Sequence, residues 1–304
     1  MGERQGFLAR GRRVAVAGVV AVVVVASFGS SVASADVSAP AVSGTAAAVS
    51  AAGASGTTRV LIRATDTATV AAQATAAGAR HVRRLKHSAT VIADVTAPAA
   101  AELGASPAVL SIAPDRVLTL ADTASAQRTE FDAAQASGYS GSGATVAILD
   151  TGIDSNHPYI GSRIVDEACF STPGNASERS LCPNGATNQL GAGAAESDGT
   201  PACMNGTENL CAHGTHVAGI AAGDAGPAPG SSGNGVAPGA SIVAIQVFTR
   251  FPADTPGGSP DVGAYDSDLV SALDYVASLA DLHPSWHLTA ANMSLGGGPV
   301  HREL

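Results

Sequence analysis

Residues 144–154 read ATVAILDTGID, an apolar run that ends at an acidic residue and a glycine. The apolar run 144–149 is typical of a strand that is buried on both faces of a sheet. Asp150 follows the run directly, and a glycine turn follows Asp150. In parallel α/β sheets the functional groups collect at the carboxyl ends of the strands. An Asp at that place is equally typical of a turn or a helix cap, so Asp150 alone indicates chemistry only weakly.

Residues 213–223 read HGTHVAGIAAG and predict a helix that packs closely on this sheet. Val217 and Ile220 follow His213 by four and seven positions, which places all three on the buried face. A histidine in the first helical turn resists positive charge, so it needs a carboxylate partner if it is to act as a base. Asp150 can be that partner, and His216 is expected to pack or hydrogen-bond locally. A metal site of Asp150, His213 and His216 is the alternative, and it lacks a further ligand motif.

The residues beyond this helix continue the alternation of buried strands and helices. The expected elements are strands at 241–248 and 288–293, and between them a helix at 267–280 that Ser267 caps. Such alternation is typical of a doubly wound parallel α/β sheet.

Residues 59–121 predict a small α+β domain. The expected order is strand, helix, strand, helix, strand, at 59–63, 68–78, 89–95, 97–103 and 109–112, followed by extended chain to 120. Its basic cluster of Arg80, Arg83, Arg84 and Lys86 either faces the acidic remainder of the chain or is solvated.

The first 35 residues predict an export signal. Four arginines precede the apolar run 14–28, which at 15 residues is shorter than the ~20 that span a bilayer. Ala33-Ser34-Ala35 then matches the small-residue pattern of a signal peptidase site. The alternative is an uncleaved membrane anchor. We expect a secreted, extracellular protein with no stable membrane anchor, in which 36–58 form a flexible linker.

Charge is distributed unevenly along the chain, which has a net charge of -9. Residues 36–121 hold seven basic and five acidic groups, whereas 122–304 hold five basic and nineteen acidic groups. A chain with this balance lacks the cations that neutralise phosphates, which excludes nucleic acid as a partner. The opposite signs of the two parts favour their mutual attraction. We expect a monomer.

All four cysteines lie within 169–211. An even number of cysteines in an exported chain predicts disulfides, and four cysteines allow three pairings. The intervening residues are rich in Gly, Asn and Pro and can turn back, which favours the pairs Cys169–Cys182 and Cys203–Cys211. A zinc site is disfavoured because no CxxC spacing occurs.

Four motifs occur in order: LDTGID at Asp150, HGTHVAGIAAG at His213, GVAPGA from 235 and NMSLGGGP from 292. Together they resemble the subtilisin-like serine proteases, or subtilases, over 144–299. The resemblance implies a subtilisin-like doubly wound α/β sheet, here incomplete. It also implies that 59–121 form an inhibitor-type propeptide, a small ferredoxin-like α+β domain. Asp150 would be the Asp of the catalytic triad and His213 its general base. Ser294, Leu295 and Gly296 would form the edge strand that binds an extended peptide substrate.

The family's serine nucleophile sits in a Gly-Thr-Ser motif at the start of another buried helix, and this motif does not occur in the 304 residues. The asparagine that completes the family's oxyanion hole has no counterpart either. We therefore expect 122–304 to be the N-terminal part of a peptidase domain that is inactive alone. The whole would be a secreted endopeptidase zymogen whose partners are protein or peptide substrates and its own propeptide. Propeptide cleavage is expected between Leu118 and Ala126.

Two other functions are compatible with these residues. The first is a catalytically dead secreted protein that binds peptides or inhibits proteases, and the second is a metal-dependent hydrolase. For the peptidase no cofactor is required. The cysteine-rich loop between Asp150 and His213 contains acidic residues and leaves room for a structural calcium ion, although no EF-hand pattern is present.

Overall fold

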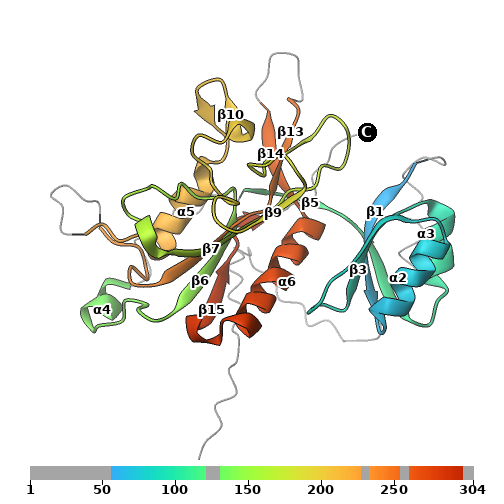
Figure 1. The fold of residues 1–304 in the computed structure, drawn as a ribbon, viewed down its shortest axis with the longest axis horizontal. Coiled ribbons are helices and arrows are strands. Elements are labelled where there is room, and N and C mark those ends of the chain that lie inside the picture. The colour runs from blue at the N-terminus through green and yellow to red at the C-terminus, as the bar shows by residue number, and fades with distance from the viewer. Residues whose placement is uncertain (1–55, 121–130, 227–232, 254–259, 297–304) are drawn as a thin grey trace, which may run out of the picture.

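The computed structural model describes residues 56–120, 131–226, 233–253 and 260–296. The expected export signal and most of the expected linker and cleavage window lie outside the described residues. Figure 1 shows a larger domain and a smaller one beside it, joined through an extended segment that follows the smaller domain.

The larger domain is built on a five-stranded sheet. Its order is β15 (Leu288–Asn292), β6 (Thr145–Asp150), β12 (Ser241–Gln246), β7 (Ile164–Phe170) and β9 (Asn188–Leu190). The first four strands run parallel, and β9 pairs antiparallel with β7. The carboxyl ends of the parallel strands therefore meet at one edge of the sheet.

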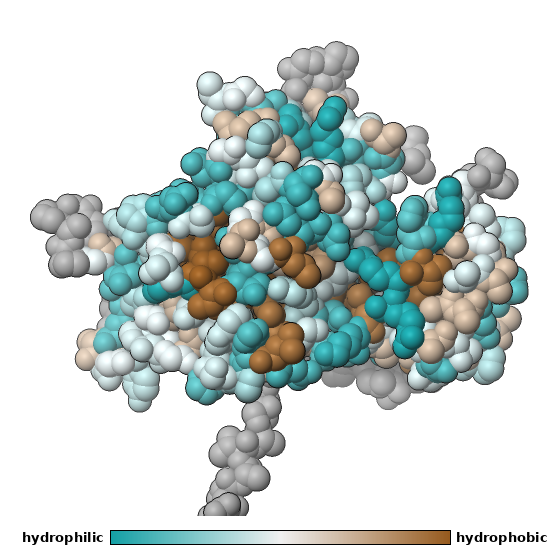
Figure 2. Space-filling view, viewed as in Figure 1, coloured by the Kyte–Doolittle hydropathy of each residue, from teal (hydrophilic) through white to brown (hydrophobic). Residues whose placement is uncertain are grey.

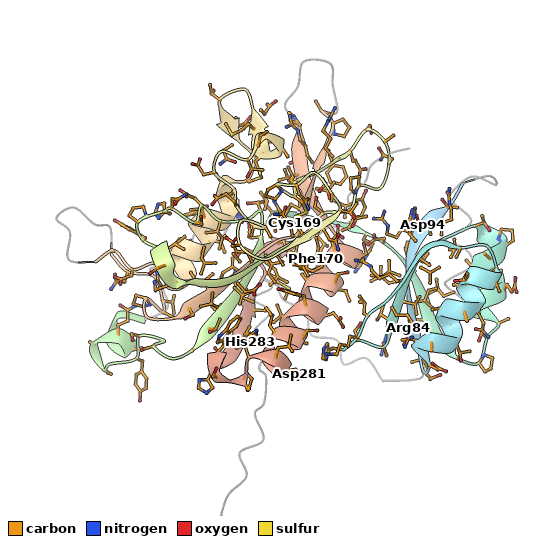
Figure 3. The ribbon with its side chains drawn as sticks, in the orientation of Figure 1. Arg84, Asp94, Cys169, Phe170, Asp281 and His283 are labelled. Carbon is orange, nitrogen blue, oxygen red and sulfur yellow. A yellow bond between two sulfur atoms is a disulfide. The ribbon has the colours of Figure 1, made fainter. Side chains whose placement is uncertain are left out.

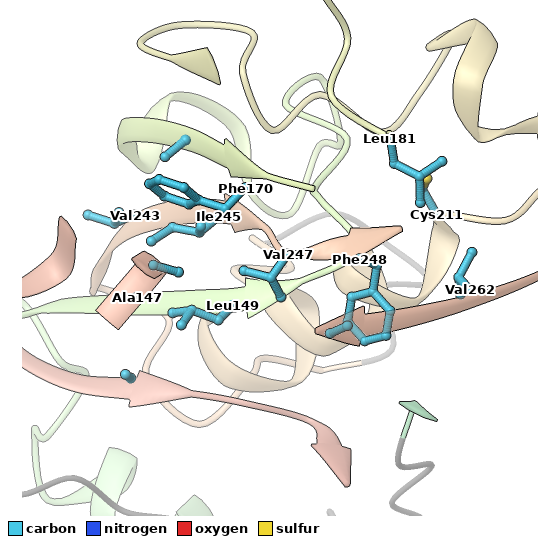
Figure 4. Packing of buried hydrophobic residues seen from close by; sticks show 14 of the residues in the cluster. Ala147, Leu149, Phe170, Leu181, Cys211, Val243, Ile245, Val247, Phe248 and Val262 are labelled. Atoms are coloured by element: carbon cyan, nitrogen blue, oxygen red, sulfur yellow. The ribbon is translucent and has the colours of Figure 1, made fainter. Parts of the chain in front are cut away.

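Helices cover both faces of this sheet. Ala147 and Leu149 of β6 belong to the core on the side of α6 (Asp266–Leu282). Figure 4 shows both side chains among other residues of this core. Ile148 points to the other side and packs with residues of α5 (Ala212–Ala222). Alternate side chains of one strand thus enter two cores, which explains why the whole run is apolar. The predicted doubly wound α/β sheet is confirmed.

Two local expectations for this domain were wrong. The insertion between Asp150 and His213 is more than a surface loop, because β7 within it is a core strand beside β12. The strand expected at 241–248 divides at Val247 into β12 and β13 (Phe248–Phe251). The side chain of Gln246 accepts a hydrogen bond from the Phe248 amide at 2.6 Å, which stabilises this bend.

A second sheet contains a strand from the N-terminal part of the chain. Its order is β16 (Leu295–Gly296), β5 (Val117–Leu120), β14 (Asp261–Tyr265), β13 and β8 (Arg179–Ser180), and all pairs are antiparallel. Strand β5 therefore fills a slot between β14 and β16.

The smaller domain has the order β1 (Thr58–Ala64), α2 (Thr67–Ala76), β2 (Arg80–Arg84), β3 (Thr90–Val95), α3 (Ala97–Gly104) and β4 (Val109–Pro114). The strands form an antiparallel sheet, β2-β3-β1-β4, as in ferredoxin-like folds. Both helices begin at capping side chains, Asp66 and Thr96. Strand β2 was not expected, because its sequence RHVRR lacks the apolar alternation of a half-buried strand and it lies at the sheet edge.

Short elements connect the others. They are α4 (Phe131–Ala136), the hairpin β10 (Met204–Asn205) and β11 (Glu208–Asn209), and the 3₁₀ turns Gly161–Arg163, Pro201–Cys203 and Pro284–Trp286. Ser267 does not cap α6 but lies inside it, because the helix begins one residue earlier.

The two domains meet along α6 and the loop after β7. Arg59 donates hydrogen bonds to the Thr172 and Pro173 carbonyls at 3.2 and 3.1 Å. It also pairs with Asp94, which lies on the side of the smaller domain that faces the larger one (Figure 3). On α6, the Asp274 carboxylate accepts three successive amides, those of residues 86–88. The basic cluster thus meets α6 through the backbone of its turn, because Arg80 and Arg84 bond within the smaller domain.

Of the helices in the described ranges, none combines the length and apolar character needed to cross a bilayer. Figure 2 shows the hydrophobic side chains on this face as separate groups among hydrophilic ones. Over all the described residues, the exposed large hydrophobic side chains include Val165, Leu190 and Leu282. Isolated groups of this kind are normal on protein surfaces.

Asp115 of the smaller domain caps α6 from outside. Its carboxylate accepts hydrogen bonds from the Ser267 amide at 2.8 Å and the Ser267 hydroxyl at 2.5 Å. Burial raises the pKa of Asp115 to about 6, against the opposing effects of the Ser267 bonds and of nearby Arg59. The folded chain therefore holds this proton more tightly than the unfolded chain, where the pKa is about 3.8.

This shift predicts a pH effect on the free energy of unfolding. The contribution of Asp115 is fully present below about pH 4 and is lost as the pH rises through about 6. Relative to Asp115→Asn, the unaltered chain should lose up to about 3 kcal/mol between pH 4 and pH 7. Urea unfolding of both chains across this range measures the difference. A difference that stays constant, or that grows with pH in favour of the unaltered chain, would contradict the assignment.

Candidate active site

Asp150 is the last residue of β6 and lies at the carboxyl edge of the parallel sheet. Its side chain is fully buried. The oxygen Oδ1 accepts the Thr151 amide at 2.7 Å and faces His213 Nδ1 at 2.8 Å. Among the described residues Oδ2 has no hydrogen-bond partner.

His213 is the second residue of α5, and its side chain is 18% exposed. It is therefore accessible, whereas its partner Asp150 is not. The buried carboxylate fixes the orientation of the imidazole ring through Nδ1. The structure thus brings together the two residues that the sequence proposed as a pair.

Thr151 connects the Asp150 loop to the start of α5. Its hydroxyl donates to the Cys211 carbonyl at 2.8 Å and accepts the Gly214 amide at 2.9 Å. No side-chain bond from Cys211, the residue that precedes the helix, caps α5. Thr151 therefore supplies the cap from a different segment, and in doing so holds His213 beside Asp150. This residue lies in the quoted motif, but its role depends on a tertiary contact that the sequence does not reveal.

Close backbone contact between the two segments requires glycine. A Cβ atom at Gly214 would overlap the carbonyl oxygen of Gly152. Gly152 itself has φ +92°, and a Cβ there would lie 2.6 Å from the Ala195 oxygen. The motif glycines thus allow the Asp150 loop and the His213 helix to approach each other.

Both cysteine pairs favoured by the sequence are joined in the structure, Cys169–Cys182 with a Cα separation of 5.6 Å and Cys203–Cys211 with one of 5.5 Å. Cys211 directly precedes α5. The second disulfide therefore holds the chain immediately before His213.

Ser294, Leu295 and Gly296 lie at one end of the second sheet. Leu295 and Gly296 form β16, whose partners are Leu120 and Thr119 of β5. Ser294 precedes this strand, and its hydroxyl accepts a hydrogen bond from the Asn292 side chain at 3.1 Å. The strand that the sequence proposed for substrate is thus occupied by another segment of the same chain.

Two cavities flank α5. One of about 550 Å³ is lined by polar groups that include Asp154, His157 and His216. His216 is exposed, so of the two alternatives expected for it, packing and local hydrogen bonding, the structure does not support packing. In the described part of the chain, no three His, Cys, Asp or Glu side chains are gathered as a metal site would need. The calcium expectation stays a prediction.

The other cavity, of about 410 Å³, is predominantly apolar and lies between α5 and β15. Its lining includes Val217, Ile220 and Ala221 of the helix, and also Ala291 and Ser294. The apolar side of the helix that carries His213 is therefore incompletely covered by the described residues.

A model of the subtilase family matches residues 141–301, about half of the chain. The chain belongs to the subtilase family. It is thereby placed among the subtilisin-like serine peptidases, and the matched residues contain both Asp150 and His213.

Two curated relatives are similar over part of their length. Bacillopeptidase F of Bacillus subtilis (strain 168) is 31% identical over 169 residues, which are 54% of this chain and 10% of the relative. Thermitase of Thermoactinomyces vulgaris is 36% identical over 115 residues, 38% of this chain and 30% of thermitase. This subtilase chain thus spans less than a third of either relative.

Among solved structures, the crystal structure of fervidolysin from Fervidobacterium pennivorans, a keratinolytic enzyme related to subtilisin, matches with a TM-score of 0.46 at 20% identity. The match covers 79% of this chain and 36% of fervidolysin.

Two glycines of α5 provide a matched test of the packing at the site. Gly214→Ala should destabilise the subtilase chain by about 2–4 kcal/mol, because the methyl group has no space against Gly152. Gly219→Ala lies in the same helix, where nothing is within 4 Å of the added atom. It should stabilise by up to about 1 kcal/mol, since alanine favours helix. Thermal unfolding measures both, and equal effects would refute the close contact.

Proposed function

We propose that residues 122–304 are part of the peptidase domain of a secreted serine endopeptidase zymogen, in which Asp150 and His213 form two members of the catalytic triad. The observation that carries this proposal is the 2.8 Å contact between His213 Nδ1 and the buried Asp150 carboxylate at the sheet edge. Membership of the subtilase family supports it.

In this mechanism His213 accepts the proton of a serine hydroxyl through Nε2 while that oxygen attacks the peptide carbonyl. The ring becomes positively charged, which the helix dipole at the start of α5 opposes. Asp150 compensates for this because its negative charge, held in a buried site, faces Nδ1. His213 then returns the proton to the leaving amine, and water hydrolyses the acyl-enzyme with His213 again as the base.

The serine would come from a helix that carries the family's Gly-Thr-Ser motif, which these 304 residues do not contain. The apolar cavity of about 410 Å³ between α5 and β15 supports this part of the proposal. A helix packed there would begin beside α5 and beside Ser294, and so between His213 and the peptide strand.

The zymogen part of the proposal rests on β5. This strand pairs on one side with β14 and on the other with β16. It thereby occupies the two strand edges with which an extended substrate would form backbone hydrogen bonds. Residues 59–121 would then be an inhibitory propeptide. Cleavage between Leu118 and Ala126 would free the end of this strand.

Secretion is supported by the export signal expected in the first 35 residues and by the two disulfides, which form in oxidising compartments. The chemistry itself uses a serine, a histidine and a carboxylate, so the proposal includes no cofactor. The proposed substrates are proteins or peptides, and the proposed enzyme is a monomer.

The triad is tested by restoring a nucleophile. Residues 1–296 are joined to the segment of thermitase that follows its equivalent strand and carries the serine. We expect this chimera to cleave a peptide substrate and to cut itself within the window 118–126. His213→Ala should lower kcat by about 10⁶ and Asp150→Asn by about 10⁴, because the base or its orientation is lost.

His216→Ala is the matched control, since it removes a histidine one turn further along α5 and should leave kcat within about threefold. Hydrolysis that survives His213→Ala undiminished, in chimeras whose unfolding transitions match, would contradict the proposal.

A second candidate is a secreted peptide-binding protein without catalysis. It is favoured by the formed peptide slot together with the missing Gly-Thr-Ser motif. A folded chimera that binds peptides in this slot but reacts with no serine-directed fluorophosphonate would support it over the peptidase.

A further inference from the structure

The hairpin β10–β11 stands directly before the helix that carries His213 (Figure 1). The disulfide Cys203–Cys211 closes its base, and both cysteines are fully buried. Figure 4 shows Cys211 in the same core as Leu181 and Phe248. The hairpin, the disulfide and the first turn of α5 are thus continuous, so a shift of the hairpin changes the position of His213.

Arg250 of β13 holds this hairpin. Its Nη1 donates to the carbonyls of Ala202 at 3.2 Å and Met204 at 2.9 Å, and its Nη2 donates to Asn205 Oδ1 at 3.3 Å. The ion pairs formed by the described residues do not include Arg250. Its half-buried guanidinium is therefore directed to the hairpin, where a charged donor makes stronger bonds than a neutral one.

The same strand belongs to the sheet that holds the peptide slot. Arg250 is paired with Val262 of β14, and two residues further along β14 Ala264 is paired with Leu118 of β5. A strand in the slot therefore lies two strands away from Arg250. A second contact reaches the same region from the end of β12. The side-chain amide of Gln246 donates a hydrogen bond to the Thr151 carbonyl at 2.8 Å and lies 3.8 Å from the Cys211 sulfur.

We propose that Arg250 is a positioning residue that couples the peptide-binding sheet to the disulfide-closed hairpin, and through it sets the orientation of His213. The inference rests on the proposed role of His213 as the base. It adds a connection between substrate binding and catalysis. A strand paired with β14 restrains β13, and Arg250 of β13 in turn restrains the hairpin and the start of α5.

The contacts within the hairpin do not attach it to β13. The ladder between β10 and β11 has only two residue pairs, Met204 with Asn209 and Asn205 with Glu208. Lysine would keep the charge but not the planar fork that reaches two carbonyls and an amide at once. The disulfide ties the ends of the hairpin to each other and does not tie them to β13.

The test compares three variants of the 304-residue chain. Arg250→Ala removes the fork, and Arg250→Lys retains the charge. Arg163→Ala is the matched control, because Arg163 also donates to two carbonyls, those of Ala240 and Tyr159, away from the hairpin. The readouts are the NMR signal of the proton on His213 Nδ1, identified by its loss in His213→Ala, and the rate at which dithiothreitol reduces Cys203–Cys211.

We expect Arg250→Ala to broaden or abolish the His213 signal and to accelerate reduction of this disulfide about tenfold, as the loss of charged hydrogen bonds implies. Reduction of Cys169–Cys182 should stay within about twofold. Arg250→Lys should recover only part of both effects, and Arg163→Ala should change neither. If Arg250→Ala does not fold, Asn205→Ala removes one of the three bonds and should change both readouts in the same direction.

Two results would overturn the proposal. One is an unchanged His213 signal and an unchanged reduction rate in Arg250→Ala. The other is an equal change in Arg163→Ala, which would indicate general destabilisation. Because the readout is the state of His213 and not turnover, failure of the peptidase proposal in the chimera would leave this result standing.

Discussion

The hydroxyl group of Thr151 is the contact on which the site depends. It accepts the Gly214 amide and donates to the Cys211 carbonyl, and so it joins the end of β6 to the start of α5. Asp150 and His213 are adjacent to these contacts in the chain, so one bridging side chain brings a carboxylate and an imidazole together. The pair forms within the described residues without any contribution from the segment that would hold the nucleophile.

Each of the two domains supplies strand or hydrogen-bond partners to the other. Without β5, the strands β14 and β16 would present two unpaired edges, which proteins seldom leave exposed. Without the larger domain, Arg59, Asp115 and the turn at 86–88 would lose the partners that they have on α6 and the loop after β7. The hydrogen bonds between the two domains fix their register. The burial that raises the pKa of Asp115 and of Asp268 belongs to this same junction.

The sequence predicted the doubly wound sheet and the Asp150–His213 pair, because buried parallel strands and motif glycines leave strong local patterns. It missed β7 and β2, whose composition resembles a loop and a charged surface, and whose strand state comes from pairing with β12 and β3. It also missed Thr151, Gln246 and Arg250. Their bonds to the Cys211, Thr151 and Met204 carbonyls span 60, 95 and 46 residues of the chain, so no local pattern marks them. The basic cluster was informative about charge, but the hydrogen bonds to the larger domain come from elsewhere. They are made by the side chains of Arg59, Asp115 and Arg116 and by the backbone amides of residues 86–88.

The most direct test of this account is the effect of Thr151 on the proton between Asp150 and His213. Thr151→Val keeps the shape of the side chain and removes both hydrogen bonds, whereas Thr151→Ser keeps the hydroxyl. We predict that the His213 Nδ1 proton signal is present in the unaltered chain and in Thr151→Ser, and is lost in Thr151→Val although that variant remains folded. A signal that persists unchanged in Thr151→Val would show that the pair forms without the bridge, and would contradict the account.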